Sequence, residues 1–346
     1  MASPKLKNHL LIAAGTLASC IAMSALGQPA KAVPSVSGTF YAIEAQGTSQ
    51  PFKLTTYTVA SNTATFSSSS NSNNGLVCSA AACTQASVNG FSYDAANKTI
   101  FFFDNNFSGT NGTPVNNGAI KVNYVSLASG TPQWGTIGTL SNTVNTATST
   151  NNGLAGAAFF NGSIYAIKNT TNTIYKIPIL YNGALPTAGQ FNNFLPDSMT
   201  LGGAPSIATS AYGDIAIDSA GGLYGVTAND RLFYKYNIQN FTNGGTLSPI
   251  INPVSTGLSE NVQIAFSGGP TLFATNAAGN WYSINTATGA ASALPFTSPG
   301  GPLVADLAGA TPVPGPLPIL GAGVAFSASR KMRKRIQVSR TNPVSA

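Results

Sequence analysis

Charge and histidine are scarce in this sequence. Only 7% of the 346 residues are charged, and the single histidine, His9, lies near the N-terminus. A Ser-His-Asp or Cys-His nucleophile system, or a histidine-ligated metal site, therefore has no histidine to use beyond that segment. This scarcity excludes most hydrolases and most transition-metal enzymes. We expect a protein that is not an enzyme.

The net charge of +7 is confined to the two ends of the chain. Lysines cluster before residue 33, and arginines and lysines cluster after residue 329. Between them seven basic residues face nine acidic residues, so residues 33–329 carry a net charge of −2. Such a body does not match a phosphate backbone. We therefore exclude nucleic acid as a partner.

The N-terminus has the pattern of a secretory signal peptide. Lysines precede an apolar run from Leu10 to Leu26, and small residues occupy Ala30 and Ala32, as signal peptidase requires. We expect cleavage after Ala32, which makes residues 1–32 the signal peptide. The stretch ending at Cys20 also fits the motif before a lipid-modified cysteine. The residues after Cys20 stay apolar, which favours ordinary cleavage, but the sequence leaves lipidation open.

Two cysteines remain after that cleavage. Cys78 and Cys83 are separated by four residues. In an oxidising compartment we expect them to form a disulfide that closes a small loop. Two buried thiols are the alternative. A metal site is less favoured, because no other ligand-type residue lies nearby in the sequence.

Short apolar and aromatic stretches recur from residue 38 onward. Each copy has an apolar strand, a turn with Asn or Gly, an aromatic strand, a second turn and a third strand. Three clear copies predict strands at 156–160, 162–167 and 173–177, at 213–217, 222–226 and 231–238, and at 262–266, 271–275 and 280–284. Weaker copies lie at 91–93, 100–103 and 122–127, and at 40–43 and 54–59. Their spacing of about 40 to 65 residues is that of propeller blades or slightly longer.

The first and last copies are each incomplete. Phe40–Ile43 has no apolar strand before it, and Val304–Gly309 has no aromatic strand after it. If the last segment supplies the missing inner strand of the first unit, the ring closes without a long free edge. The sequence therefore predicts an all-β propeller of about five blades over residues 33–310. An irregular β-sandwich is the alternative.

Carboxylates are the remaining candidates for catalysis, because a glycosidase needs only two and a ring of blades can gather them. Asp214 and Asp306 hold matching positions in the repeated strand, which indicates a structural role. Asp94 and Asp218 follow predicted inner strands at turns, where aspartate commonly binds its own backbone. The full set of candidates is Asp94, Asp104, Asp214, Asp218, Glu260 and Asp306. A carboxylate-based glycan-cleaving enzyme stays open as the alternative function.

No cofactor is expected. Asp104-Asn105-Asn106 offers oxygen ligands for Ca²⁺, but it lacks the EF-hand spacing and a closing carboxylate, which favours a polar loop. No glycine-rich stretch lies between a strand and a helix with a following lysine, so nucleotide binding has no support. Trp134 and Trp281 offer surfaces for sugar stacking, although packing between blades also accounts for aromatics at repeat positions.

The C-terminal end has three consecutive parts. Residues 311–318 are proline-rich and cannot continue a sheet. Residues 319–329 are apolar and predict a short hydrophobic helix, and residues 330–346 form a basic tail that would stay on the cytoplasmic side. The uncharged run from Leu317 to Ser329 has thirteen residues, short of the roughly twenty that span a bilayer.

This tail resembles the PEP-CTERM sorting signal, and VPGPLPILGAGVAFSASRKMRKRI is similar to the variant found in cyanobacteria. Two prolines match those of the family, whereas Gly315 replaces the glutamate in the family's name. The corresponding positions are Pro312, Pro314, Gly315, Pro316, Arg330, Lys331, Arg333, Lys334 and Arg335. The resemblance implies export, recognition by a membrane-embedded exosortase, and association with extracellular polysaccharide or surface matrix.

Together these features predict an exported protein at the cell surface or outside the cell. Its expected partners are the export machinery, an exosortase-like processing enzyme, and a polysaccharide or another surface protein. The tail would contact the membrane at least transiently, and permanent anchoring is the alternative to its removal. Neither the ligand nor the oligomeric state follows from the sequence.

Overall fold

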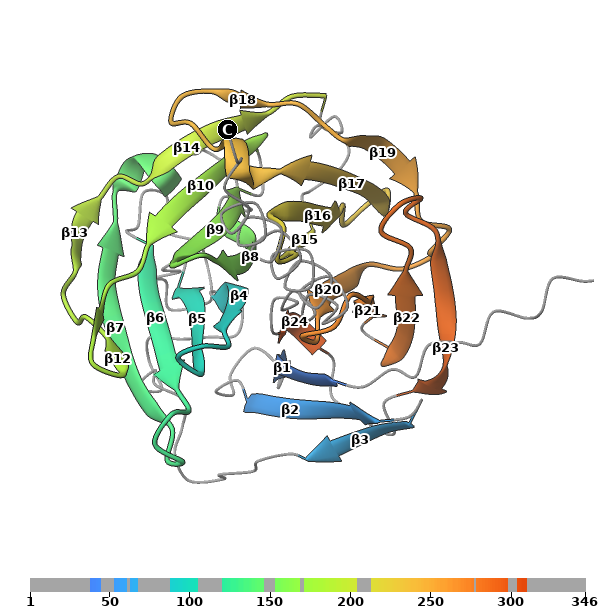
Figure 1. Cartoon of the computed structure of the whole chain (residues 1–346), viewed down its shortest axis with the longest axis horizontal. Helices are drawn as coiled ribbons and strands as arrows, with labels where there is room; N and C mark the ends of the chain where they lie inside the picture. The colour runs from blue at the N-terminus through green and yellow to red at the C-terminus, as the bar shows by residue number, and fades with distance from the viewer. Residues whose placement is uncertain are drawn as a thin grey trace, which may run out of the picture. The chain divides into compact units, whose positions relative to one another are not determined.

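The computed structural model is built almost entirely of β-strands that form blades around a common axis (Figure 1). It describes residues 38–44, 53–60, 63–67, 88–104, 120–145, 153–168, 171–203, 213–276, 278–297 and 304–309. Two short 3₁₀ helices, Asn142–Asn145 and Ile238–Asn240, interrupt the strands. In this described part of the chain, no helix is long and apolar enough to cross a membrane.

Five blades of antiparallel strands surround the axis, each named here from its innermost strand outward. Blade 1 contains β24 (Val304–Gly309), β1 (Gly38–Glu44), β2 (Lys53–Ala60) and β3 (Thr63–Ser67). Blade 2 contains β4 (Val88–Asp94), β5 (Thr99–Asp104), β6 (Lys121–Ser126) and β7 (Gln133–Leu140). Blade 3 contains β8 (Leu154–Phe160), β9 (Ser163–Lys168), β10 (Thr173–Pro178) and β14 (Asp197–Leu201). Blade 4 contains β15 (Asp214–Ile217), β16 (Gly222–Val226), β17 (Leu232–Asn237) and β19 (Ile251–Ser255), and blade 5 contains β20 (Val262–Phe266), β21 (Leu272–Asn276), β22 (Asn280–Ile284) and β23 (Ala291–Thr297).

The ring closes through blade 1, as the incomplete first and last repeats predicted. The late strand β24 pairs antiparallel with the early strand β1, so that Ala42 faces Leu307 in the register. The predicted five-bladed propeller is confirmed, and the alternative of an irregular sandwich is wrong. Since the last strand completes the first blade, the two ends of the repeat series hold each other in place.

The outer strands were not predicted, and they explain the irregular repeat spacing. Two short strands belong to a blade other than the one that follows them in the chain: β13 (Phe191–Phe194) pairs parallel with β7, and β18 (Thr246–Leu247) pairs parallel with β14. The hairpin of β11 (Tyr181–Asn182) and β12 (Leu185–Pro186) lengthens the third repeat further. These strands are short and carry many exposed residues, so they lack the apolar pattern that identifies inner strands.

The core consists of hydrophobic clusters between neighbouring blades. Inner and second strands have both faces covered, which is why Thr99–Asp104 reads TIFFFD and is buried throughout. Trp281 illustrates the packing: it is 1% exposed and its ring lies 5.4 Å from Phe40 and 5.8 Å from Tyr57, both in blade 1. The aromatic residues of the repeat therefore hold blade to blade.

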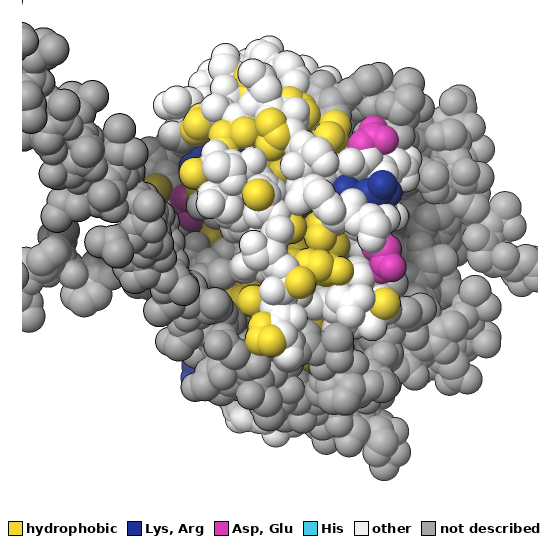
Figure 2. All heavy atoms as spheres, turned by 90° about the vertical axis from the view of Figure 1, so that its right-hand side faces the viewer, with side chains coloured by type: hydrophobic (Ala, Val, Ile, Leu, Met, Phe, Trp, Pro, Cys, Tyr) yellow, Lys and Arg dark blue, Asp and Glu magenta, His cyan; other side chains and the backbone are white. Residues whose placement is uncertain are grey.

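The surface of the described residues carries little charge. On the face shown in Figure 2, uncharged polar and hydrophobic atoms occupy most of the described area, and only a few charged side chains are scattered among them. This agrees with a composition in which only 7% of residues are charged.

Candidate functional site

Two aspartates lie deep in the ring, next to the axis. Asp214 on β15 and Asp306 on β24 are 0% and 1% exposed. An innermost strand has a partner on one side only, so alternate backbone N–H groups on its other edge need acceptors from elsewhere. Each aspartate supplies two such acceptors. The sequence-based expectation that their matching positions serve structure is supported by these contacts.

The two carboxylates join neighbouring blades in the same way. Ile215 N–H donates to Asp214 Oδ1 at 2.7 Å, and Ile264 N–H on β20 donates to Asp214 Oδ2 at 2.8 Å. Leu307 N–H donates to Asp306 Oδ1 at 2.8 Å, and Phe91 N–H on β4 donates to Asp306 Oδ2 at 2.9 Å. Asp214 thus connects blade 4 to blade 5, and Asp306 connects blade 1 to blade 2.

The same repeat position in blade 3 is a glycine for a steric reason. A Cβ atom on Gly156 would lie 2.9 Å from both Cα and Oδ1 of Asp214. The aspartate therefore has room beside β8 only because its neighbour has no side chain. This glycine and aspartate act as a pair across the boundary between blades 3 and 4.

The protonation of both buried acids is shifted. Burial raises the pKa of Asp306 to about 7, against the opposing effect of the backbone N–H groups that it accepts. Burial, followed by the negative charge of Asp306, raises the pKa of Asp214 well above its usual value. Shifted carboxyl pKa values are a feature of catalytic sites, but they also arise wherever carboxylates are buried for structural reasons.

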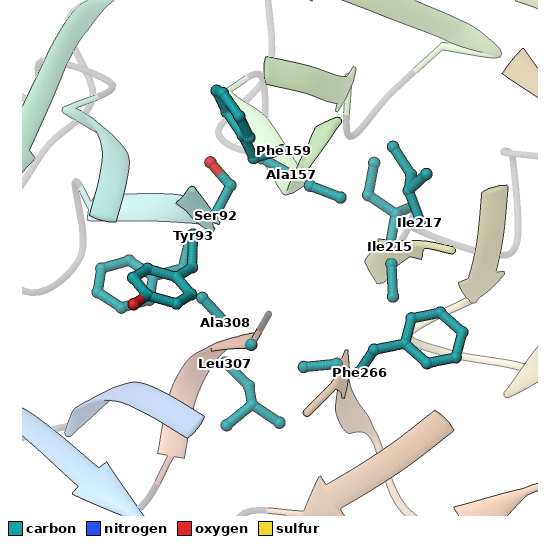
Figure 3. A pocket seen from close by; sticks show the side chains of 14 residues that line it. Ser92, Tyr93, Ala157, Phe159, Ile215, Ile217, Phe266, Leu307 and Ala308 are labelled. Atoms are coloured by element: carbon teal, nitrogen blue, oxygen red, sulfur yellow. The ribbon is translucent and has the colours of Figure 1, made fainter. Parts of the chain in front are cut away.

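The space at the axis is too small for a substrate. The axial cavity has a volume of about 20 Å³ and is lined by residues of all five innermost strands, including Ser92, Ala157 and Phe266 (Figure 3). That volume accommodates a single water molecule. The Ser92 hydroxyl is 2% exposed and has no hydrogen-bond partner within the described residues. Asp214 and Asp306 therefore sit in a closed core and not in a cleft that admits a glycan.

Asp94 and Asp218 bind their own turns, as expected from their position after an inner strand. Asp94 Oδ1 accepts from Ala96 N–H at 3.0 Å, and Asp218 Oδ1 accepts from Ala220 and Gly222 N–H at 2.9 and 2.8 Å. These contacts close the turns between the first and second strands of blades 2 and 4.

Each of these turn aspartates also binds a tyrosine at the same distance. Tyr224 donates from its hydroxyl to Asp218 Oδ2 at 2.6 Å within blade 4. Tyr181 donates to Asp94 Oδ2 at 2.6 Å from the loop after β10, so this bond joins blade 3 to blade 2. Burial, followed by the hydrogen bond to Asp94, raises the pKa of Tyr181, so its phenol keeps the proton that it donates.

A larger pocket adjoins the Asp94–Tyr181 pair and is called here the interblade pocket. It has a volume of about 350 Å³ and is lined by residues 93–97 in blade 2, and by residues 159–162, Ile179 and Tyr181 in blade 3. Aromatic rings and amide groups dominate the lining, and Asp94 is the one ionisable acid among these lining residues. The volume lies at the lower end of the range for small-molecule sites.

The hairpin between β8 and β9 shapes one wall of this pocket. Asn161 and Gly162 have φ angles of 46° and 75°, the left-handed conformation that a two-residue hairpin turn requires. Asn and Gly tolerate this conformation best, which is why the Asn-Gly pair was readable as a turn. The tight turn brings Phe159, Phe160 and Asn161 to the rim together.

The other candidate acids do not join this pocket. Glu260 accepts a hydrogen bond from Asn276 Nδ2 at 2.6 Å, in blade 5. Asp104 is buried at the end of β5, where the register pairs it with Lys121. The ranges that the structure describes contain no group of three or more His, Cys, Asp or Glu residues placed to hold a metal ion.

Several predicted positions lie outside the described residues. These are the signal peptide with Ala30 and Ala32, the cysteines Cys20, Cys78 and Cys83, the loop residues Asn105 and Asn106, and the whole segment 311–346 with its sorting motif. The cleavage site, disulfide, C-terminal helix and sorting signal thus stay predictions.

The sequence pointed to Asp94 but not to Tyr181 or the pocket. Tyr181 lies 87 residues from Asp94 in the chain and follows the third strand of a different repeat. No local pattern connects the two. The only available signal was the long insertion between the third and fourth strands of blade 3, since insertions in a repeat often form binding surfaces.

Comparison with known proteins gives similarity to solved structures alone. No family model matches, and no curated protein matches. A protein from Lactobacillus plantarum has 13% identity and a TM-score of 0.39, over 82% of this chain and 69% of that chain. A nidogen/laminin complex gives 10% identity and 0.40, covering 79% and 98%. A catalytically inactive virginiamycin B lyase from Staphylococcus aureus, solved with quinupristin, gives 13% and 0.36, covering 79% and 74%. These resembling structures therefore include both an enzyme and a binding complex.

Proposed function

We propose that this protein is exported and acts at the cell surface or in the extracellular matrix as a non-catalytic propeller that binds polysaccharide. The observation that carries the proposal is the contrast between the two cavities. The paired acids Asp214 and Asp306 adjoin an axis with about 20 Å³ of space, whereas the pocket of about 350 Å³ has Asp94 as its one acid. A glycosidase needs two carboxylates that flank the scissile bond.

Export and sorting are supported by the ends of the sequence. The signal-peptide pattern of residues 1–32 and the PEP-CTERM-like tail after residue 311 favour a route through the export machinery and an exosortase-like enzyme. The low charge of the body suits a protein that works among uncharged glycans, because such partners offer no charges to match.

A binding and hydrolysis assay tests the functional part. The full-length protein is incubated with polysaccharide prepared from the surface of the cells that make it, and both co-sedimentation and new reducing ends are measured. We expect co-sedimentation without reducing ends. Release of reducing ends by the purified protein would replace the proposal with the glycan-cleaving alternative, and binding to surface proteins in place of the polysaccharide would also overturn it.

The intact mass and terminal peptides of the protein recovered from cells test export. We expect surface material to begin at Val33 and to lack the tail from about Pro316. Retention of Arg330 to Arg335 in the membrane fraction alone would replace sorting by permanent anchoring. An unprocessed Met1 in the cytosol would overturn export.

A further inference from the structure

The interblade pocket has a preformed wall. Asp94 is 4% exposed, and its two carboxylate oxygens bind the turn backbone, the side-chain amide of Asn97 at 2.8 Å and the hydroxyl of Tyr181 at 2.6 Å. Blades 2 and 3 are thereby joined at the pocket itself. A ligand that enters would find these groups already ordered, which lowers the entropic cost of binding.

The chemistry of the lining selects one kind of ligand. Tyr93, Phe159, Phe160 and Tyr181 provide aromatic rings, and Asn97 and Asn161 provide amides that both donate and accept hydrogen bonds. A ligand that uses both must have an apolar face and a rim of hydroxyl groups. A pyranose ring has this form, because its axial C–H groups lie on a face and its hydroxyls lie around the edge.

The charge of the lining narrows the ligand further. The residues that line the pocket include the carboxylate of Asp94 and no lysine or arginine. An anionic sugar would place its charge close to that carboxylate without a cation to offset the repulsion. A neutral sugar meets no such penalty.

We propose that the interblade pocket binds one neutral pyranose unit of a polysaccharide, held against the aromatic rings of blade 3 and hydrogen-bonded by Asn97 and Asn161. This inference rests on the proposed function and adds the site and the class of sugar. The Tyr181 hydroxyl acts as a positioning group, because its proton is donated to Asp94 and its ring forms part of the wall.

Two variants of the pocket test the proposal, and each has a matched control elsewhere in the ring. Tyr181→Phe removes the hydroxyl bond to Asp94, and Tyr224→Phe removes the equivalent 2.6 Å bond to Asp218, away from the pocket. Phe160→Leu removes an aromatic ring from the rim. Phe241→Leu is its control, because both phenylalanines pack on the ring of Tyr165, at 6.5 and 5.7 Å, and only Phe160 lines the pocket.

The probes are purified dextran, mannan and galactan as neutral polysaccharides, and polygalacturonate as the anionic counterpart of galactan. Binding of the full-length protein is measured by affinity electrophoresis, and folding of each variant is checked by thermal unfolding. We expect retardation by at least one neutral polysaccharide and not by polygalacturonate. Phe160→Leu and Tyr181→Phe should weaken that binding about five- to tenfold, while both controls keep it unchanged.

The failures of the two proposals are distinguishable. Neutral binding that survives both pocket variants, or that both control variants weaken equally, would overturn the pocket and leave polysaccharide binding in place. Binding to polygalacturonate alone would do the same. Absence of binding to every polysaccharide, including that from the cell surface, would overturn both.

Discussion

Two pairs of aspartates occupy repeated positions in this ring, and they differ in what surrounds them. Asp214 and Asp306 lie on innermost strands and bind N–H groups of two blades in a closed core. Asp94 and Asp218 lie in the following turns, where each binds its own backbone and one tyrosine. The inner pair joins blades to each other, whereas the turn pair orders loops. Only one of the four, Asp94, borders a pocket large enough for a ligand.

The inner pair should matter most for stability. Asp306→Ala leaves the N–H groups of Phe91 and Leu307 buried without acceptors, and each such loss costs about 1–3 kcal/mol, partly offset because a buried carboxyl is also removed. We expect a net loss of about 2 kcal/mol, seen as a fall of roughly 4–8 °C in the midpoint of thermal unfolding. Asp306→Asn keeps one acceptor oxygen and should lose less. An unchanged midpoint in Asp306→Ala would remove the distinction between the two pairs.

The inner pair should also make stability depend on pH. Burial raises the pKa of Asp306 from 3.8 to about 7, so folding favours its protonated form. The stabilisation is complete below the unfolded pKa of 3.8 and is lost as the pH rises through about 7. The free energy of unfolding should fall by up to about 1.4 kcal/mol per pH unit in that interval.

Urea unfolding at pH 5 and pH 8 measures this slope. Asp306→Asn should flatten it, because the substituted side chain does not titrate. A slope of the opposite sign in the unmodified protein, or the same slope in the variant, would show that Asp306 is not its source.

Loss of a turn aspartate should cost less and separate the two turns. Asp94→Ala and Asp218→Ala each lose turn bonds and one tyrosine bond, for about 1–2 kcal/mol. Asp94→Ala should also speed amide hydrogen exchange in residues 179–182 of blade 3, because Tyr181 loses its anchor. Asp218→Ala should leave exchange outside blade 4 unchanged. Equal exchange patterns would mean that the tyrosine bond between blades is not formed.

The smallest effect is expected at Ser92. Its hydroxyl lies in the axial core beside the inner pair, yet it has no partner within the described residues. Ser92→Ala removes a buried polar group and should raise the unfolding midpoint slightly or leave it within about 0.5 kcal/mol. A loss above about 1 kcal/mol would show that the hydroxyl binds a water molecule in the axial cavity.

The sequence was sufficient to predict the inner parts of the blades. Strands such as Ile100–Phe103 and Leu223–Val226 are buried on both faces, so burial leaves a continuous apolar and aromatic record in the chain. The outer strands left no such record. In Phe191–Phe194 the two central residues are exposed, and pairing with β7 depends on backbone bonds that any residue can make.

Sequence alone determined the repeat, its closure by Val304–Gly309, and the turn roles of Asp94 and Asp218, because each follows from local periodicity or from a residue's bonds to its own backbone. Tertiary structure alone decided which tyrosine each turn aspartate binds and where a pocket forms. Those contacts depend on how blades 2 and 3 meet, through residues such as Asp94 and Tyr181 that are 87 positions apart. Contacts of that range leave no pattern within either segment, so only the folded ring brings them together.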